Sequence, residues 1–290
     1  MPCRILKGAP VAEALSIELS ERVRALGERG VVPCLGMIRI GERAGDLSYE
    51  RSASKRCEAL GIAIRKRFLD ESVTEQELLA VIAEMNADDT VHGILFFRPL
   101  PEGMDMRAIC DAIAPGKDVD GVGARSMADV YMGAAHGFFP CTAQAVMEML
   151  HYYQIPVCGK RAVVVGRSLV TGRPAALLLL REHATVSVCH TRTEDLAALT
   201  RQADLIVTAT GHINTLTREH LTRGQVVIDI GLTYDEARGK LCGDVDHEAA
   251  EEIVDAISAV PGGIGAVTST VLCAHVIEAA ETLSEVRNDL

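Results

Sequence analysis

The stretch "GDLSYERSASKRC", residues 45–57, places Tyr49 ahead of two basic residues in a segment expected to be helical. On a helix, the side chain one turn further along the same face is Ala53, at an angular offset of about 40°. Lys55 is offset by about 240° and points elsewhere. The segment is therefore either a catalytic face that lacks its base or a solvated helix that carries a tyrosine.

A glycine turn between a strand and a helix is the second candidate site. In "RAVVVGRSLVTGRP", Gly166 allows a tight turn, and Gly172 lets backbone approach the start of the next helix. Free N–H groups and the helix dipole favour a pyrophosphate at such a turn. The spacing is not Gly-x-Gly-x-x-Gly, so an ordinary strand-to-helix turn remains the alternative.

The end of the following strand bears on which dinucleotide would bind. This end reads "CHTRTED", and Arg192 comes before any acid. We expect Thr193 to cap the next helix, with Glu194 and Asp195 in its first turn. An acid at the strand end would suit a free ribose 2′-hydroxyl, whereas Arg192 together with Arg167 suits a 2′-phosphate. This favours NADP over NAD, unless Arg192 is only a solvated surface charge.

Apolar runs alternate with helix-period segments through the first half of the chain. The pattern predicts helices at 10–28, 45–61 and 74–86, and strands at 32–40, 62–69 and 91–97. Thr74 and Glu77 form a capping-box pattern at the start of the third helix. Strands alternating with helices predict a parallel sheet with right-handed crossovers.

The second half of the chain repeats this alternation after a less regular segment, 99–139. We expect helices at 140–153 and 265–283, and strands at 161–166, 184–189, 203–210, 225–231 and 256–263. The fold class is therefore α/β with two domains. The expected first domain is 1–139 together with 266–290, whose final helix returns to it, and the expected second is the Rossmann-like domain 140–265.

The composition excludes several classes of function. The net charge of −11 disfavours nucleic acid or an acidic membrane as a partner. Nine cysteines without a C-x-x-C pair suggest reduced thiols rather than a disulfide or metal framework. The start "MPCRILKG" lacks a secretory pattern, and no apolar run reaches ~18 residues. We expect a cytoplasmic protein without a metal.

Several further segments carry a resemblance to a known family. They are "GILFFRPLP" at 93–101, "PGKDVDG" at 115–121, "PCTAQAVMEML" at 140–150, "GKRAVVVGRSLVTGRP" at 159–174, "CHTRT" at 189–193, "GDVD" at 243–246 and "VPGGIGAVT" at 260–268. In this order, over nearly the full length, the chain resembles the methylenetetrahydrofolate dehydrogenase/cyclohydrolase family.

The resemblance implies a folate substrate and an NADP cofactor. A hydride would pass from the methylene bridge of 5,10-methylenetetrahydrofolate to the nicotinamide, after which water would open the resulting methenyl ring. The family's cofactor positions fall on Gly166, Arg167, Ser168, Thr191 and Leu232. The family is typically dimeric through its cofactor domains, so the resemblance also implies a homodimer.

The resemblance also assigns a folate side to the site. The Tyr49 ring would pack on the folate, and Asp120 would accept hydrogen bonds from the pterin N–H groups; otherwise Asp120 is a turn former beside Gly121. The segment Pro261, Gly262 and Gly263 would bring backbone close to the substrate, or else forms a plain helix entry.

Two departures from the family pattern concern the ring-opening reaction. The family carries a lysine four residues after the tyrosine and a glutamine in the neighbouring strand, and these positions are Ala53 and Phe97 here. Lys55 lies off the face, and Arg56 is a poor proton shuttle because guanidinium stays charged. We expect a dehydrogenase with weak or absent cyclohydrolase activity.

Three alternatives stay open from the sequence. The enzyme is fully bifunctional if Lys55, a water chain or another group rescues ring opening. The second is a cofactor-binding regulatory or scaffold protein that has lost catalysis, which the retention of Tyr49, Asp120 and the phosphate loop disfavours. A shikimate-type dehydrogenase would need a lysine–aspartate pair, for which Lys117 with Asp118 or Asp120 is the nearest candidate.

Overall fold

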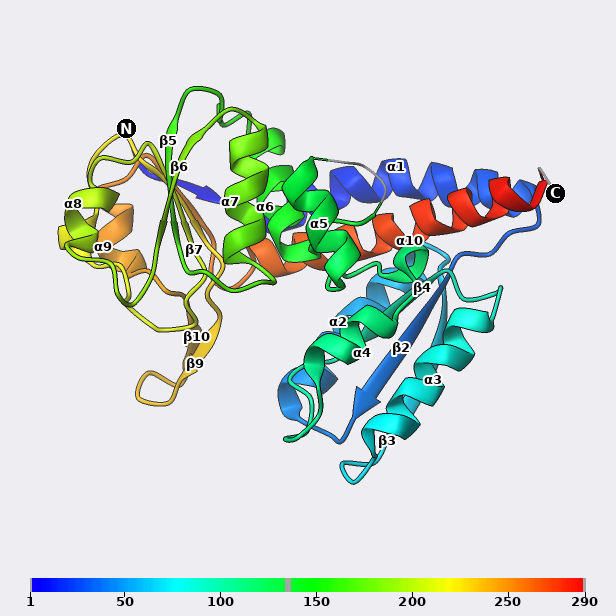
Figure 1. Cartoon of the computed structure of the whole chain (residues 1–290). Helices are drawn as coiled ribbons and strands as arrows, with labels where there is room; N and C mark the ends of the chain where they lie inside the picture. The colour runs from blue at the N-terminus through cyan, green and yellow to red at the C-terminus, as the bar shows by residue number, and fades with distance from the viewer. Residues whose placement is uncertain (1, 134–136, 289–290) are drawn as a thin grey trace. The chain divides into compact units, whose positions relative to one another are not determined.

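The computed structural model describes residues 2–133 and 137–288, which form two compact units (Figure 1). We call residues 14–141 with 269–290 the three-stranded unit, and residues 1–13 with 142–268 the six-stranded unit. The expected domain limits, 1–139 with 266–290 and 140–265, stay a prediction. Residues 1, 134–136 and 289–290, which the expected first domain includes, lie outside the described residues.

The three-stranded unit contains a parallel sheet in the order β3-β2-β4. Its strands are β2 (Cys34–Ile40), β3 (Ala63–Leu69) and β4 (Gly93–Phe96), connected by α2 (Ala44–Ala59) and α3 (Glu75–Ala87). Every residue of β2 is buried, as expected for the central strand of a covered parallel sheet. Thr74 and Glu77 form the expected capping box. The predicted strand–helix alternation and parallel pairing are confirmed.

The segment expected to be irregular contains two short helices, α4 (Met106–Ala112) and α5 (Ala124–Met132), with the 3₁₀ turn η1 (Pro115–Lys117) between them. Asp105 caps α4 by accepting from the backbone N–H groups of Arg107 and Ala108. Gly133 ends α5 with a left-handed conformation. The segment is less regular than its neighbours, and the sequence did not locate its helices because short capped helices leave a weak periodic signal.

Two long helices contribute to both units by their residue ranges, namely α1 (Gly8–Glu28) and α10 (Ile264–Asn288). Within the three-stranded unit, Glu281 of α10 pairs with Arg22 of α1 at 2.6 Å. Cys273 of α10 lies 3.7 Å from Cys57 of α2, measured between the sulfurs. The predicted return of the final helix is confirmed. The stretch Ile264–Glu285 is long and apolar enough to span a membrane, but 67% of it is buried, as in a core helix.

The six-stranded unit contains a parallel sheet in the order β1-β11-β8-β7-β5-β6. The strands are β1 (Arg4–Leu6), β5 (Arg161–Val165), β6 (Thr185–Cys189), β7 (Leu205–Thr208), β8 (Val226–Asp229) and β11 (Ala256–Ser258). The five strands after residue 140 lie within the expected ranges. The sequence pattern did not indicate β1, which exists because Arg4–Leu6 pairs in parallel with Ala256–Ser258.

Helices cover both faces of this sheet. Figure 1 shows α7 on one face, with α8 and α9 on the other. The helices are α6 (Cys141–Tyr152), α7 (Gly172–Arg181), α8 (Leu196–Thr200) and α9 (His247–Glu251), with the 3₁₀ turn η2 (Arg218–His220). An antiparallel hairpin, β9 (Thr233–Asp235) with β10 (Lys240–Cys242), follows β8. The expected two-domain α/β fold class is confirmed.

Candidate functional site

The three-stranded unit brings Tyr49 and Phe97 together. Tyr49 lies on α2, and Phe97 directly follows β4, where its N–H donates to the Ile38 carbonyl at 3.0 Å and extends the sheet ladder. The two rings meet edge-on, with centroids 5.9 Å apart and planes at 78°. Such an edge-to-face contact is a favourable arrangement for two aromatic rings.

The face of α2 that carries Tyr49 also carries Ala53, which is completely buried. Lys55 is exposed, in keeping with its position round the helix from Tyr49. Phe97 is only 4% exposed. The described geometry therefore leaves a methyl group and an aromatic ring at the two positions where the family pattern carries a lysine and a glutamine.

Asp120 lies close to this pair and forms an ion pair. Its Oδ2 accepts a hydrogen bond from Nη2 of Arg98 at 2.6 Å. Burial raises the pKa of Asp120, whereas the Arg98 guanidinium opposes that shift. The result is a partly buried carboxylate that depends on its neighbours to remain ionised.

The turn that contains Asp120 is capped by a different carboxylate. Asp118 accepts from the backbone N–H groups of Val122 and Gly123, at 3.0 and 2.8 Å, and from the Ser126 hydroxyl at 2.6 Å. Asp118 thus makes the turn contacts that the alternative interpretation assigned to Asp120. Oδ2 of Asp120 instead forms the ion pair with Arg98.

Tyr49 is suited to packing and hydrogen bonding rather than to proton abstraction. Burial, above all, raises the pKa of Tyr49 well above its usual value, and the nearby Asp120 carboxylate raises it further. A phenol with a raised pKa stays protonated at neutral pH. Its hydroxyl can donate or accept a hydrogen bond, but its conjugate base is essentially unpopulated.

Two residues that sequence reasoning missed support the backbone next to Asp120. Nδ1 of His275 donates to the Val119 carbonyl at 2.8 Å, and the Cys141 thiol donates to the same oxygen at 3.2 Å. Burial lowers the pKa of His275 to about 4, so the ring is neutral near pH 7. Cys141 was visible within "PCTAQAVMEML", but His275 had no local signal, because its partner is distant in sequence.

Lys117 contacts main-chain carbonyls at the end of a helix. Its Nζ donates to the carbonyls of Met85, Asn86 and Asp88 at 3.1, 2.8 and 2.8 Å. These carbonyls lie at the end of α3, where helix termini leave acceptors unsatisfied. Lys117 therefore stabilises the C-terminal end of α3.

The six-stranded unit contains the glycine turn between β5 and α7. A Cβ atom at Gly166, where φ is +127°, would lie 2.4 Å from the Ala209 carbonyl oxygen. A Cβ atom at Gly172 would lie 2.2 Å from the Gly166 carbonyl oxygen. Oγ of Ser168 accepts from the N–H groups of Thr171 and Gly172 at 3.2 and 3.3 Å. The loop is closely folded, and only glycine fits at its two ends.

The end of β6 lies beside this loop, since the N–H of Gly166 donates to the Cys189 carbonyl at 2.9 Å. Arg167, Thr191 and Arg192 are all exposed at these neighbouring strand ends. Leu232, after β8, is also exposed, at 57%. The carboxyl ends of parallel strands are where doubly wound sheets bind ligands.

The expectation that Thr193 caps α8 is wrong. Asp195 is the N-cap, and its side chain accepts from the Ala198 N–H at 3.0 Å. Thr193 instead uses its hydroxyl to accept from the His190 N–H at 2.8 Å. The tight turn after β6 takes up two more residues before the helix begins, so Glu194 and Asp195 lie ahead of its first turn.

The segment Pro261, Gly262 and Gly263 belongs to the six-stranded unit and leads into α10. Pro261 and Gly262 are exposed, whereas Gly263 is buried. The Gly262 carbonyl accepts from the Gly8 N–H at 2.8 Å, at the start of α1. This backbone therefore joins the beginnings of two helices, and its exposed part is accessible to a ligand.

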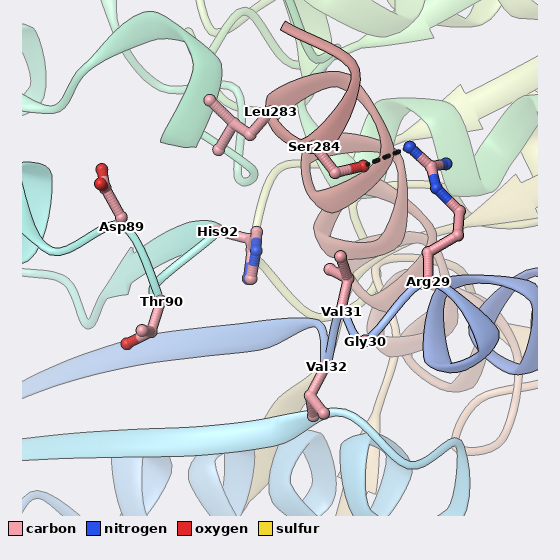
Figure 2. Close-up of a pocket in the computed structure, with 9 residues that line it drawn as sticks. All are labelled: Arg29, Gly30, Val31, Val32, Asp89, Thr90, His92, Leu283 and Ser284. Atoms are coloured by element: carbon pink, nitrogen blue, oxygen red, sulfur yellow. Dashed lines mark hydrogen bonds between the residues drawn. The ribbon is translucent and has the colours of Figure 1, made fainter. Parts of the chain in front are cut away.

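A hollow in the three-stranded unit contains none of the predicted site residues. It measures about 360 Å³ and lies beside the segments that precede β2 and β4. Figure 2 shows Arg29 pointing toward Ser284, with Asp89 on the other side of the hollow. Among residues 2–133 and 137–288, no group of three or more metal-ligating side chains could hold a metal. The nine cysteines are free thiols.

Comparison with known proteins identifies the family. Residues 6–120 match the catalytic domain of tetrahydrofolate dehydrogenase/cyclohydrolase, and residues 140–284 match its NAD(P)-binding domain. The chain is 46% identical to the bifunctional protein FolD of Carboxydothermus hydrogenoformans over 280 residues, which are 96% of this chain and 98% of that protein.

Solved structures give the same result. The bifunctional FolD enzyme of Campylobacter jejuni has a TM-score of 0.94 at 39% identity, covering 97% of this chain and 99% of that one. The Trypanosoma brucei FolD enzyme, solved with NADP cofactor and an inhibitor, has a TM-score of 0.92 at 33% identity, covering 97% and 98%. This chain belongs to the tetrahydrofolate dehydrogenase/cyclohydrolase family.

Proposed function

We propose that this protein is an NADP-dependent 5,10-methylenetetrahydrofolate dehydrogenase of one-carbon metabolism, with weak or absent methenyltetrahydrofolate cyclohydrolase activity. Family membership supports the dehydrogenase reaction. The proposal of weak or absent cyclohydrolase activity rests on the contact between Tyr49 and Phe97, beside a buried Ala53.

The residues of the six-stranded unit fit an NADP cofactor. The close approach of the Gly172 and Gly166 backbones, which a Cβ atom at Gly172 would prevent, supports a tight glycine loop of the kind that receives a pyrophosphate. Arg167 and Arg192 are the residues proposed to contact a 2′-phosphate, which their exposure supports, and Ser168, Thr191 and Leu232 are proposed to contact the rest of the cofactor. When bound, NADP supplies the hydride acceptor.

On the folate side we propose Tyr49 and Asp120 of the three-stranded unit, while Pro261, Gly262 and Gly263 stay substrate-binding residues by the family resemblance alone. The Tyr49 ring would stack on the folate, and the Asp120 carboxylate would accept from the pterin N–H groups. Loss of hydride produces a cation that its own amidine nitrogens stabilise. The protein therefore needs mainly to orient two flat rings and to exclude water.

Ring opening makes a greater demand on the protein. An attacking water molecule must lose a proton, and protons must then move as the C–N bond breaks. Ala53 has no titratable group, Phe97 is apolar, and Tyr49 stays protonated because burial raises its pKa. Loss of a positioned acid–base group typically removes ~10²–10⁴-fold in rate.

The second candidate is the fully bifunctional enzyme, which is favoured by the bifunctional names of relatives at 40–46% identity.

The test is to assay the purified protein for methylenetetrahydrofolate oxidation, with NADP and NAD in parallel, and for methenyltetrahydrofolate hydrolysis. We expect NADP-linked oxidation, with hydrolysis near the uncatalysed rate. Hydrolysis as fast as oxidation would reject the proposal in favour of bifunctionality, whereas NADP binding without oxidation would indicate a non-catalytic protein.

We further propose that residues 1–139 with 266–290 carry the folate function and residues 140–265 the NADP function. The two family matches, 6–120 and 140–284, support this division. We also propose a cytoplasmic homodimer formed through the NADP domains. Light scattering during gel filtration would test this, and a monomer at micromolar concentration would reject it.

A further inference from the structure

Arg98 stands directly after Phe97 and reaches a different partner. Its Nη2 lies 2.6 Å from Oδ2 of Asp120, and the two side chains are only 24% and 13% exposed. The guanidinium carbon lies 5.9 Å from the centroid of the Phe96 ring. A short, partly buried pair of this kind is stronger than an exposed surface ion pair.

The other groups near Asp120 do not supply a charge that replaces Arg98. Burial and the Asp118 carboxylate both raise the pKa of Asp120, and the neighbouring Cys141 thiol carries no positive charge. The Tyr49 hydroxyl, on α2, is neutral. Within the part of the chain that the structure describes, Arg98 is the cation that forms an ion pair with Asp120.

The protonation state of Asp120 matters to its proposed ligand. A pterin presents amino and ring N–H donors, and only an ionised carboxylate offers both oxygens as acceptors. In this chain α2 contributes no cation from position 53, since that residue is Ala53. The positive charge comes instead from the end of β4.

We propose that Arg98 is a positioning residue for the dehydrogenase reaction: it holds Asp120 as an oriented carboxylate that accepts hydrogen bonds from the folate ring. This inference rests on the proposed function, because it assumes that Asp120 contacts folate. A guanidinium keeps its proton throughout the working pH range. Arg98 therefore balances the charge of Asp120 without supplying a group that could move protons for ring opening.

The first test compares Arg98→Gln and Arg98→Lys by steady-state kinetics between pH 5 and 9. Arg98→Gln should raise the KM for methylenetetrahydrofolate about tenfold or more, as expected for a lost charge-assisted hydrogen bond. The acid limb of kcat/KM should move to higher pH, because Asp120 without its cation protonates more readily. Arg98→Lys keeps the charge and should return the limb toward the wild-type position.

A double-mutant cycle with Asp120→Asn tests whether Arg98 acts through Asp120. The amide cannot ionise, so adding Arg98→Gln should change KM by less than about twofold, as expected when two residues share one contact. Arg22→Gln is the matched control, because it removes the partly buried Arg22–Glu281 pair of the same unit. It should leave the KM, the acid limb and the Kd for NADP unchanged.

Binding of tetrahydrofolate, measured by calorimetry, separates the failure of this inference from the failure of the proposed function. If wild-type protein binds tetrahydrofolate but does not oxidise its methylene derivative, the proposed activity is rejected. Weaker binding by Arg98→Gln would then still support the role of Arg98. A folded Arg98→Gln variant with wild-type tetrahydrofolate affinity would overturn that role, as would wild-type protein that binds no tetrahydrofolate.

Discussion

The Tyr49 ring meets the Phe97 ring edge-on at a centroid distance of 5.9 Å, one turn of α2 away from the buried methyl group of Ala53. This contact joins the helix and the strand whose residues would handle protons in the family pattern. We propose that packing between Tyr49 and Phe97 takes the place of acid–base chemistry here, while the groups proposed to hold the folate remain. The relationship leads directly to a gain-of-function experiment.

Combining Ala53→Lys with Phe97→Gln should restore ring opening. The substitutions return an amine and an amide to the two positions, and the smaller glutamine leaves room for the new lysine. We expect methenyltetrahydrofolate hydrolysis to rise by about tenfold or more, a part of the usual ~10²–10⁴-fold contribution of a positioned acid–base group. Rates are measured on protein whose melting temperature has been checked.

The matched control combines Phe97→Gln with Ser52→Lys, which adds the same lysine at an exposed position of α2. Equal hydrolysis rates in the two double variants would show that the position of the amine is irrelevant. The diagnosis of a missing proton-handling group would then be incorrect.

His275 should make the stability of the protein depend on pH. Its folded pKa of about 4 lies below the ordinary value of 6.5, so the unfolded chain binds more protons in this window. The free energy of unfolding therefore falls as the pH decreases from about 6.5 to about 4. Between pH 7.5 and pH 5, we expect this residue to account for a loss of about 2 kcal/mol.

Urea unfolding of wild-type protein and of His275→Asn at the two pH values measures this contribution. The asparagine amide can still donate to the Val119 carbonyl but does not titrate. The loss on acidification should be smaller in the variant, whatever its absolute stability. Parallel pH dependence in the two proteins would assign the effect to other groups.

Gly172→Ala should weaken NADP binding. The new Cβ atom would lie 2.2 Å from the Gly166 carbonyl oxygen, so the loop that is proposed to receive the pyrophosphate must shift. Overpacking of this kind costs about 1–3 kcal/mol, and we expect the Kd for NADP to rise about tenfold. Calorimetric titration with NADP provides the measurement.

Gly27→Ala is the control for this prediction, because its Cβ atom meets nothing within 4 Å and the residue lies in the last turn of α1. Replacing this glycine should change the stability of the protein by less than about 1 kcal/mol without altering NADP affinity. If Gly172→Ala binds NADP as tightly as Gly27→Ala does, the loop is not the phosphate site.

Arg192→Ala should reduce the preference for NADP over NAD. The residue follows β6, beside the glycine turn, where it can contact a 2′-phosphate that NAD lacks. Loss of a charge-assisted contact should raise the KM for NADP about tenfold and leave the KM for NAD within about twofold. Arg223→Ala provides the control. Arg223 is exposed and precedes β8, so it lies at the amino-terminal ends of the parallel strands, whereas Arg192 lies at their carboxyl ends. An equal effect on both cofactors would contradict a role in 2′-phosphate recognition.

Much of the fold was predictable because local sequence patterns reflect local geometry. The periodicity of apolar residues located the strands of both sheets except β1, and the helical repeat placed Ala53 on the face of Tyr49 and Lys55 off it. The capping box at Thr74 and Glu77 was also readable, since both partners lie within one turn. By contrast, the cap at Thr193 was misjudged, because the tight turn after β6 uses that hydroxyl for another N–H.

The sequence by itself determined most of the α/β elements, the family and the presence of Ala53 and Phe97 at the two positions proposed to bear on ring opening. Only the tertiary structure decided which distant residues meet: β1 with β11, His275 with the Val119 carbonyl, and Arg98 with Asp120. The physical reason is that a helix or strand follows from neighbours along the chain. A contact between sequence-distant segments instead depends on how the crossovers bring strand ends and helix faces together. That arrangement also decides which buried charges form ion pairs.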